Sequence, residues 1–150
     1  MSELKFSFIQ NPKDQMLNEI YNFDVKAFAD SQDFDWTKEN IKKELKEGWN
    51  IVSVKADNDI VCALFIKEED KALFTKNTPI KITHQGNGYS HIIKDFYEDY
   101  AKDKGLKKVV NYCRDDNFRM ISLNEGHHYV RTGKVIKGTA NLIEWEKKLK

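Results

Sequence analysis

An uninterrupted apolar run from Ile60 to Ile66 constrains the fold of this chain more than any other feature. Its seven residues are too few for a typical helix, and the run is rich in β-formers. Successive side chains of a strand point to opposite faces of the sheet, so a strand that is apolar at every position must be covered on both faces. The sequence therefore predicts a central strand that is buried on both sides.

Shorter segments predict the other strands. Asn50 to Ala56 alternates apolar and polar residues, and the turn-forming Asp57-Asn58-Asp59 follows it. Leu73 to Ile82 predicts a further strand, interrupted at Pro79 because proline lacks the donor that a ladder needs. The remaining predicted strands are Lys5 to Ile9, Lys108 to Tyr112, Tyr129 to Ile136 and Thr139 to Lys147.

Helical spacing of apolar residues predicts helices between these strands. The first spans residues 14–30, and a second begins after a Thr37 cap and ends at Gly48. A third follows residue 88 and is closed by Gly105. Its apolar face, with Ile92, Ile93, Phe96, Tyr97 and Tyr100, is interpreted as core rather than as a substrate site.

A short fourth helix, capped by Asp116 or Asn117, completes the order β-α-α-β-β-β-α-β-α-β-β. This order predicts an α+β (mixed α/β) fold, in which helices pack on a mixed sheet. The length of 150 residues fits one domain over residues 1–150.

Charge and cysteine content narrow the function classes. The 25 basic and 24 acidic residues are interleaved and leave a net charge of +1, which does not indicate a nucleic-acid partner. Cys62 and Cys113 lie in apolar runs, and their spacing fits neither a disulfide framework nor a zinc motif. The sequence starts without a signal-peptide pattern and has no apolar run of about 20 residues. We therefore expect a cytoplasmic protein without a membrane partner.

The segment HQGNGYS, residues 84–90, joins a predicted strand to a predicted helix. Glycines let a backbone turn tightly and come close to a ligand, and free N–H groups at a helix start attract phosphate. The segment lacks the Lys-Ser/Thr pair of a Walker loop and the third glycine of a dinucleotide fingerprint. It therefore predicts a phosphate site of another kind, or a turn that merely connects two elements.

At these residues the chain resembles the GNAT family of N-acetyltransferases. The family's pyrophosphate loop reads Gln/Arg-x-x-Gly-x-Gly/Ala, and Gln85 and Gly88 match its first and fourth positions. Ser90 stands at the last position, where glycine or alanine is usual. The segment from Asn117 to Glu125 resembles the family's second block, and Tyr129 fills its aromatic position, with His128 in place of the usual glycine.

The resemblance implies a mostly antiparallel sheet of about seven strands flanked by about four helices, and acetyl-CoA as co-substrate with an amine acceptor. The strand at Ile80, Lys81 and Ile82 is expected to lend backbone groups to the pantetheine arm, and Pro79 to splay it from its neighbour. The pyrophosphate is expected on the loop residues, and Asn117 on the pantetheine. The loop residues are Gln85, Gly86, Asn87, Gly88, Tyr89 and Ser90.

Many relatives place a tyrosine general acid where this chain has Asn124. An amide cannot protonate a leaving group, but it can hydrogen-bond the coenzyme sulfur, and a thiol with a pKa near about 8.5 leaves largely as thiolate. Candidates for the general base are His84, Glu69 and a water chain. No metal is expected, because the adjacent His127 and His128 would point to opposite faces of a strand.

The amine acceptor is expected against the first two helices, where aromatic and acidic residues that suit a cation are concentrated. A solvated acidic face over core aromatics is the alternative. The residues are Phe23, Phe28, Phe34 and Trp36, with Asp24, Asp30, Asp33 and Asp35.

Two other functions stay open: a catalytically silent acyl-CoA-binding module of the same fold, and a phosphate-binding interaction protein unrelated to coenzyme A. The C-terminal hairpin could also extend a sheet across a homodimer.

Overall fold

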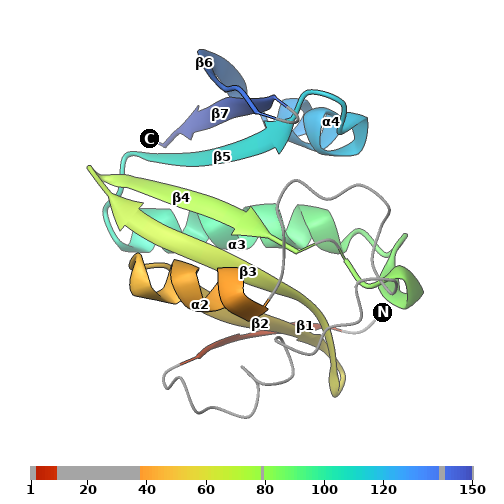
Figure 1. Ribbon diagram of the computed structural model, residues 1–150. Coiled ribbons are helices and arrows are strands. Elements are labelled where there is room, and N and C mark those ends of the chain that lie inside the picture. Colours follow the sequence, from red (N-terminus) through yellow and green to blue (C-terminus); the bar gives the residue numbers. More distant parts are fainter. Residues whose placement is uncertain (1–2, 10–37, 79, 139–140, 150) are drawn as a thin grey trace. The chain divides into compact units, whose positions relative to one another are not determined.

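The computed structural model describes residues 3–9, 38–78, 80–138 and 141–149. Its strands form a seven-stranded sheet in the order β1-β2-β3-β4-β5-β7-β6 (Figure 1). β4 pairs with β5 in parallel, whereas the β1–β2, β2–β3, β5–β7 and β6–β7 pairs are antiparallel. This confirms the predicted α+β class with a mixed sheet. The helix predicted over residues 14–30 and the cap at Thr37 lie outside the described residues.

The chain divides into two compact units, and each is described by itself. Unit 1 comprises Met1–Lys67 and Asn77–Tyr89. Its elements are β1 (Leu4–Phe8), α2 (Lys38–Lys46), β2 (Asn50–Ala56), most of β3 (Asp59–Glu69) and the 3₁₀ helix η2 (Ile82–His84).

Unit 2 comprises Glu68–Lys76 and Ser90–Lys150. Its elements are most of β4 (Ala72–Asn77), α3 (Tyr89–Asp103) from Ser90 onward, β5 (Lys108–Arg114), α4 (Phe118–Gly126), β6 (Val130–Ile136) and β7 (Leu142–Lys148). One domain over residues 1–150 stays a prediction. No helix in the described part of either unit is long and apolar enough to cross a membrane.

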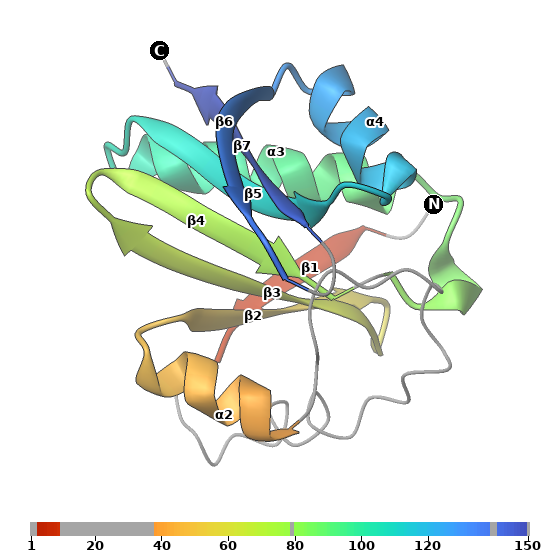
Figure 2. The ribbon, with the colours of Figure 1, turned by 45° about the horizontal axis from the view of Figure 1, so that its top comes forward.

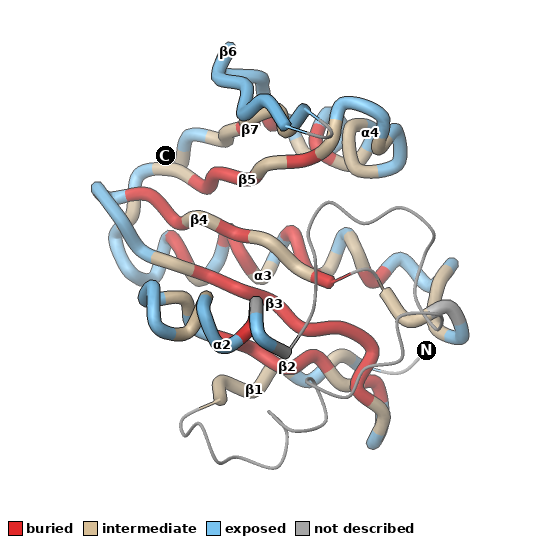
Figure 3. Tube along the Cα trace, in the orientation of Figure 1, coloured by how far each residue is buried: buried red, intermediate tan, exposed pale blue. Residues whose placement is uncertain are grey.

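The core of unit 1 forms around β3, which is buried from Ile60 to Ile66, as predicted (Figure 3). On one side of the sheet, Ile41 of α2 packs with Ile51, Ala63 and Phe65. Removal of such side chains from water is the main source of stability, at about 25 cal/mol per Å². Gly48 ends α2 with a positive φ of 98°, and the N–H of Trp49 donates to Glu44 O.

In unit 2, α3 runs along one face of β4 and β5 (Figures 1 and 2). Ile93, Tyr97 and Ala101 are buried at helical spacing. This confirms two residues of the predicted apolar face, whereas Ile92, Phe96 and Tyr100 are only half-buried. The same face also buries two charged residues, Lys94 and Glu98, which the apolar periodicity did not reveal.

The prediction that one strand continues from Leu73 to Ile82 is wrong, because β4 ends at Asn77. The N–H of Ala63 on β3 donates to the Thr78 hydroxyl (3.0 Å), so a side chain replaces a backbone acceptor there. The Lys81 N–H returns to β3 and donates to Val61 O (2.8 Å), and the chain then turns into η2. Pro79, the expected point of interruption, lies outside the described residues.

β4 and β5 pair only over their first residues. The ladder runs from Ala72 opposite Lys108 to Thr75 opposite Asn111, whereas β5 pairs with β7 as far as Arg114. At the last pair, the Thr75 hydroxyl donates to Val110 O (3.2 Å). The parallel ladder therefore stops before β5 does, and the splay expected at Pro79 stays a prediction.

Candidate functional site

Gly86 and Gly88 of unit 1 form a backbone that other residues adopt only with strain. Their φ angles are 85° and 75°, in the left-handed region. A Cβ placed on either glycine would meet no atom within 4 Å among the described residues. Both glycines are exposed, so no described residue blocks the approach of a ligand to their backbone.

Polar side chains of the loop brace it from within. The Gln85 amide donates from Nε2 to Ile80 O (2.7 Å), and the Asn87 amide donates from Nδ2 to His84 O (2.9 Å). Gln85, the first residue of the predicted motif, thus ties the loop to the segment before η2. Its side chain shapes the loop, and the backbone N–H groups remain the natural donors to an anion.

The loop ends where α3 begins. Tyr89 is buried at the first position of the helix, and Ser90 is half-buried beside it. The first N–H groups of a helix have no intrahelical partner, and the positive end of the helix dipole lies behind them. Such a helix start after a glycine loop can bind phosphate without a charged side chain.

Lys81 and His84 hold the segment before the loop to the β2–β3 turn. Asp59 Oδ1 accepts from Lys81 Nζ (3.1 Å), and Asp59 Oδ2 lies 2.8 Å from His84 Nε2. Burial raises the pKa of the Asp59 carboxyl, but the hydrogen bonds from His84 and Lys81 lower it more, so the net shift is downward. His84, a predicted candidate for the general base, therefore has one ring nitrogen held by a carboxylate.

Asn117 of unit 2 is the N-cap of α4, as one of the two predicted alternatives had it. Its Oδ1 accepts from the Met120 N–H (3.2 Å), which satisfies one of the unpaired donors of the first turn. The pantetheine contact expected of the same residue stays a prediction.

Asn124 is fully buried at the C-terminal end of α4. Its Oδ1 accepts from Lys94 Nζ (2.8 Å) and from Asn111 Nδ2 (2.9 Å), and its Nδ2 donates to Asn111 Oδ1 (3.1 Å). A weaker contact joins Nδ2 to Cys113 Sγ (3.9 Å). Both the oxygen and the nitrogen of the Asn124 amide are thus engaged by buried partners of unit 2. One of these partners, Asn111, is the residue of β5 at which the ladder with β4 ends.

Lys94 is the buried cation of this network, and sequence reasoning missed it. Its ammonium lies 4.2 Å from the centre of the Tyr129 ring. Burial lowers the pKa of Lys94 to about 7, against the opposing attraction of Cys113 and Glu98. Sequence reasoning also missed a cluster at α3 and the end of α4, formed by His91, Asp95, Glu98 and His127. The first three of these residues are spaced so that they share one face of a helix, and this spacing was the signal available in the sequence.

Other sequence-predicted residues fall elsewhere. Glu69, a second candidate for the general base, lies at the exposed end of β3. The expected acceptor residues lie outside the described residues: Phe23, Phe28, Phe34 and Trp36, with Asp24, Asp30, Asp33 and Asp35.

No protein-family model matches the sequence, and no curated protein matches it. Solved structures match over nearly the whole chain. The ribosomal-protein-S18-alanine N-acetyltransferase from Escherichia coli is 12% identical, with a TM-score of 0.78 and coverage of 97% of this chain and 94% of that one. A GNAT family acetyltransferase from Elizabethkingia anophelis with acetyl-CoA bound is 16% identical, with a TM-score of 0.72 and coverage of 97% and 98%.

The spermidine N-acetyltransferase from Vibrio cholerae, in complex with CoA and spermine, is 14% identical, with a TM-score of 0.69 and coverage of 97% and 95%. At these identities the likeness is one of fold. It agrees with the seven-stranded mixed sheet and its helices. The chain has the fold of the GNAT acetyltransferases.

Proposed function

We propose that this protein is an acetyl-CoA-dependent N-acetyltransferase that acts on a primary amine of a small molecule or peptide. The observation that carries the proposal is the loop at Gly86 and Gly88, with its open left-handed backbone at the start of α3, within a GNAT fold. Structural neighbours with acetyl-CoA or CoA bound support this choice of ligand.

The coenzyme is bound mainly through backbone groups in this proposal. The N–H groups from Gly86 to Ser90 receive the pyrophosphate, and Asn117 contacts the pantetheine arm. Ile80 O and the Lys81 N–H already have partners within unit 1, so neither group is assigned to the pantetheine.

The reaction is a direct attack. The neutral amine nitrogen bonds to the carbonyl carbon of the thioester, and the carbon–sulfur bond breaks as the coenzyme leaves as thiolate. The amine's extra proton passes to a base or to water. Because a thiol with a pKa near about 8.5 is a good leaving group, the step needs no tyrosine acid. Asn124 then supports β5 and α4 through its buried bonds rather than touching the sulfur.

A catalytically silent acyl-CoA-binding module is the second candidate. It is favoured by Asn124, which stands where many relatives have a general acid and is fully buried with its amide engaged. A phosphate-binding protein unrelated to coenzyme A is the third, because the loop alone is suited to any phosphate.

Two measurements separate these functions. Acetyl-CoA should raise the melting temperature, because a ligand that binds only the folded state stabilises it by mass action. If inorganic phosphate stabilises the protein and acetyl-CoA adds nothing, the third function holds.

Turnover is then measured by release of free coenzyme thiol with a panel of amines. Cys62 and Cys113 are both buried, so the folded protein should contribute little thiol signal. Coenzyme binding without turnover on any amine would favour the silent module.

A further inference from the structure

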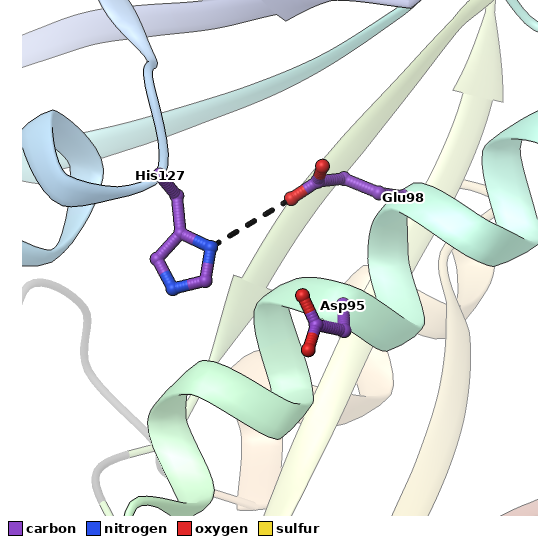
Figure 4. Close-up of side chains that lie close together, drawn as sticks. All are labelled: Asp95, Glu98 and His127. Atoms are coloured by element: carbon purple, nitrogen blue, oxygen red, sulfur yellow. Dashed lines mark ion pairs between the residues drawn. The ribbon is translucent and has the colours of Figure 1, made fainter.

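Three ligand-type side chains converge between α3 and the end of α4, within unit 2. Asp95 and Glu98 lie one helical turn apart on α3, and His127 is the C-cap of α4 (Figure 4). One ligand atom from each lies within 4.8 Å of the others. Two carboxylates and an imidazole in this proximity are a donor set that divalent metal ions bind.

Glu98 has a buried oxygen that accepts no hydrogen bond from any of the described residues. The residue is only 8% exposed, and its Oε1 accepts from Lys147 Nζ (2.6 Å). Its Oε2 is the buried oxygen without such a bond in the described part of the chain, and it lies 3.9 Å from His127 Nδ1. That distance is too long for a hydrogen bond, but it is near the roughly 3–4 Å that separates two ligands of one ion with bonds of about 2 Å.

The other nitrogen of His127 is already engaged in a way that suits ligation. His127 Nε2 lies 2.8 Å from His91 Nδ1, so one of these two nitrogens donates a proton to the other. When His127 Nε2 is the donor, Nδ1 is left with a free lone pair on the side of Glu98. A metal-binding histidine usually has such an outer partner, which fixes its tautomer and ring orientation.

We propose that Asp95, Glu98 and His127 bind one divalent transition-metal ion of the Zn²⁺ type, with His91 as the positioning residue. Glu98 binds through Oε2 alone, because Lys147 occupies Oε1. Asp95 is exposed and gives the ion access, with water in the remaining coordination position. The ion would join α3 to the end of α4.

The test uses untagged full-length protein, stripped with a chelator and dialysed. Zn²⁺ is titrated calorimetrically, and Co²⁺ is titrated as a spectroscopic probe. We expect one saturable equivalent and visible Co²⁺ absorption bands from an ordered N/O site of low coordination number. Asp95→Asn, Glu98→Gln and His127→Gln should each abolish this binding. His91→Gln should weaken it by about tenfold to a hundredfold, as expected for an outer partner.

Matched controls come from the same elements. Asp99→Asn on α3 and His128→Asn beside His127 should bind Zn²⁺ as the unmodified protein does. Asp95 is exposed, so Asp95→Asn should stay folded even if Glu98→Gln does not, and circular dichroism checks each variant. Absence of saturable binding, or equal binding by Asp95→Asn, would overturn the site. Loss of binding in both controls would point to nonspecific histidine and carboxylate contacts and would overturn it too.

Discussion

Asn124 joins a buried ammonium, a second amide and a thiol, so its loss should be felt in the free energy of unfolding. Asn124→Ala leaves Lys94 and Asn111 without their partner in the core. An unpaired buried polar group costs about 1–3 kcal/mol, and we expect a loss in that range by urea unfolding. Asn141→Ala is the control, because that amide is exposed and bonds only to Asp115 among the partners that the structure describes. A large loss of turnover with unchanged stability would instead make Asn124 a catalytic residue.

The Asp59 carboxylate gives a prediction in the pH dependence of stability. The pKa of this carboxyl is lower in the folded protein than in the unfolded chain. The ionised carboxylate therefore stabilises the folded protein fully at pH values above the unfolded pKa, and this stabilisation is lost as the pH falls through the folded pKa. The side chain is 46% exposed, and screening limits the effect to under about 1 kcal/mol. Asp59→Asn should therefore be less stable than the unmodified protein at pH 7, and the difference should vanish in strong acid.

Asp70→Asn is the control for Asp59→Asn, since Asp70 is an exposed aspartate in the next turn of the chain. It should show no comparable difference at either pH. If Asp59→Asn is still less stable than the unmodified protein in strong acid, the negative charge of Asp59 is not what holds Lys81 and His84 to the turn.

The glycines at the two ends of α3 allow the effect of backbone strain on stability to be separated from an effect on ligand binding. Gly88 precedes the helix and Gly105 follows it. Both have positive φ (75° and 70°), and a Cβ on either would meet no described atom within 4 Å. Valine at either position should cost about 1–3 kcal/mol of stability, because a β-branched residue is strained there. Only Gly88→Val should also lose coenzyme binding, measured as the melting shift with acetyl-CoA. Equal shifts in both variants would contradict the phosphate role of the loop.

The N-cap of α4 gives a prediction for both stability and coenzyme affinity. Asn117→Ala removes the bond to the Met120 N–H and should cost about 1 kcal/mol of stability. If Asn117 also contacts the pantetheine, the affinity for coenzyme should fall by roughly tenfold, about 1–2 kcal/mol. Asn117→Ser keeps a capping oxygen and should restore stability but not affinity. Unchanged affinity in Asn117→Ala would leave the residue with the cap alone.

Local sequence patterns predicted those strands whose burial on one or both faces of the sheet is visible in the order of apolar and polar residues. The apolar run at Ile60 to Ile66 and the alternation at Asn50 to Ala56 correspond directly to β3 and β2. The end of β4 was missed because it depends on the Thr78 hydroxyl bonding to a residue distant in sequence. The loop was found because its glycines carry a local signal, whereas Lys94 and His127 gain their surroundings only when α3 and α4 come together.

For the whole molecule, the charge balance bears on how an anionic coenzyme is attracted. The chain has 25 basic and 24 acidic residues and a pI of about 7.7, so its net field at neutral pH is weak. Backbone N–H groups at a helix start act over short distances and need no such field. Affinity for the coenzyme should then depend on the loop geometry much more than on ionic strength.

We therefore expect the dissociation constant for CoA to rise only modestly, by less than about tenfold, between about 0.1 M and 1 M salt. Over that range the Debye length falls from about 10 Å to about 3 Å, which removes long-range attraction but leaves direct contacts. Calorimetric titration at several concentrations of NaCl measures the slope, and potassium glutamate in place of NaCl controls for chloride competing at the loop. A steep slope that persists in glutamate would show that lysine side chains, rather than the backbone of Gly86 to Ser90, bind the phosphates.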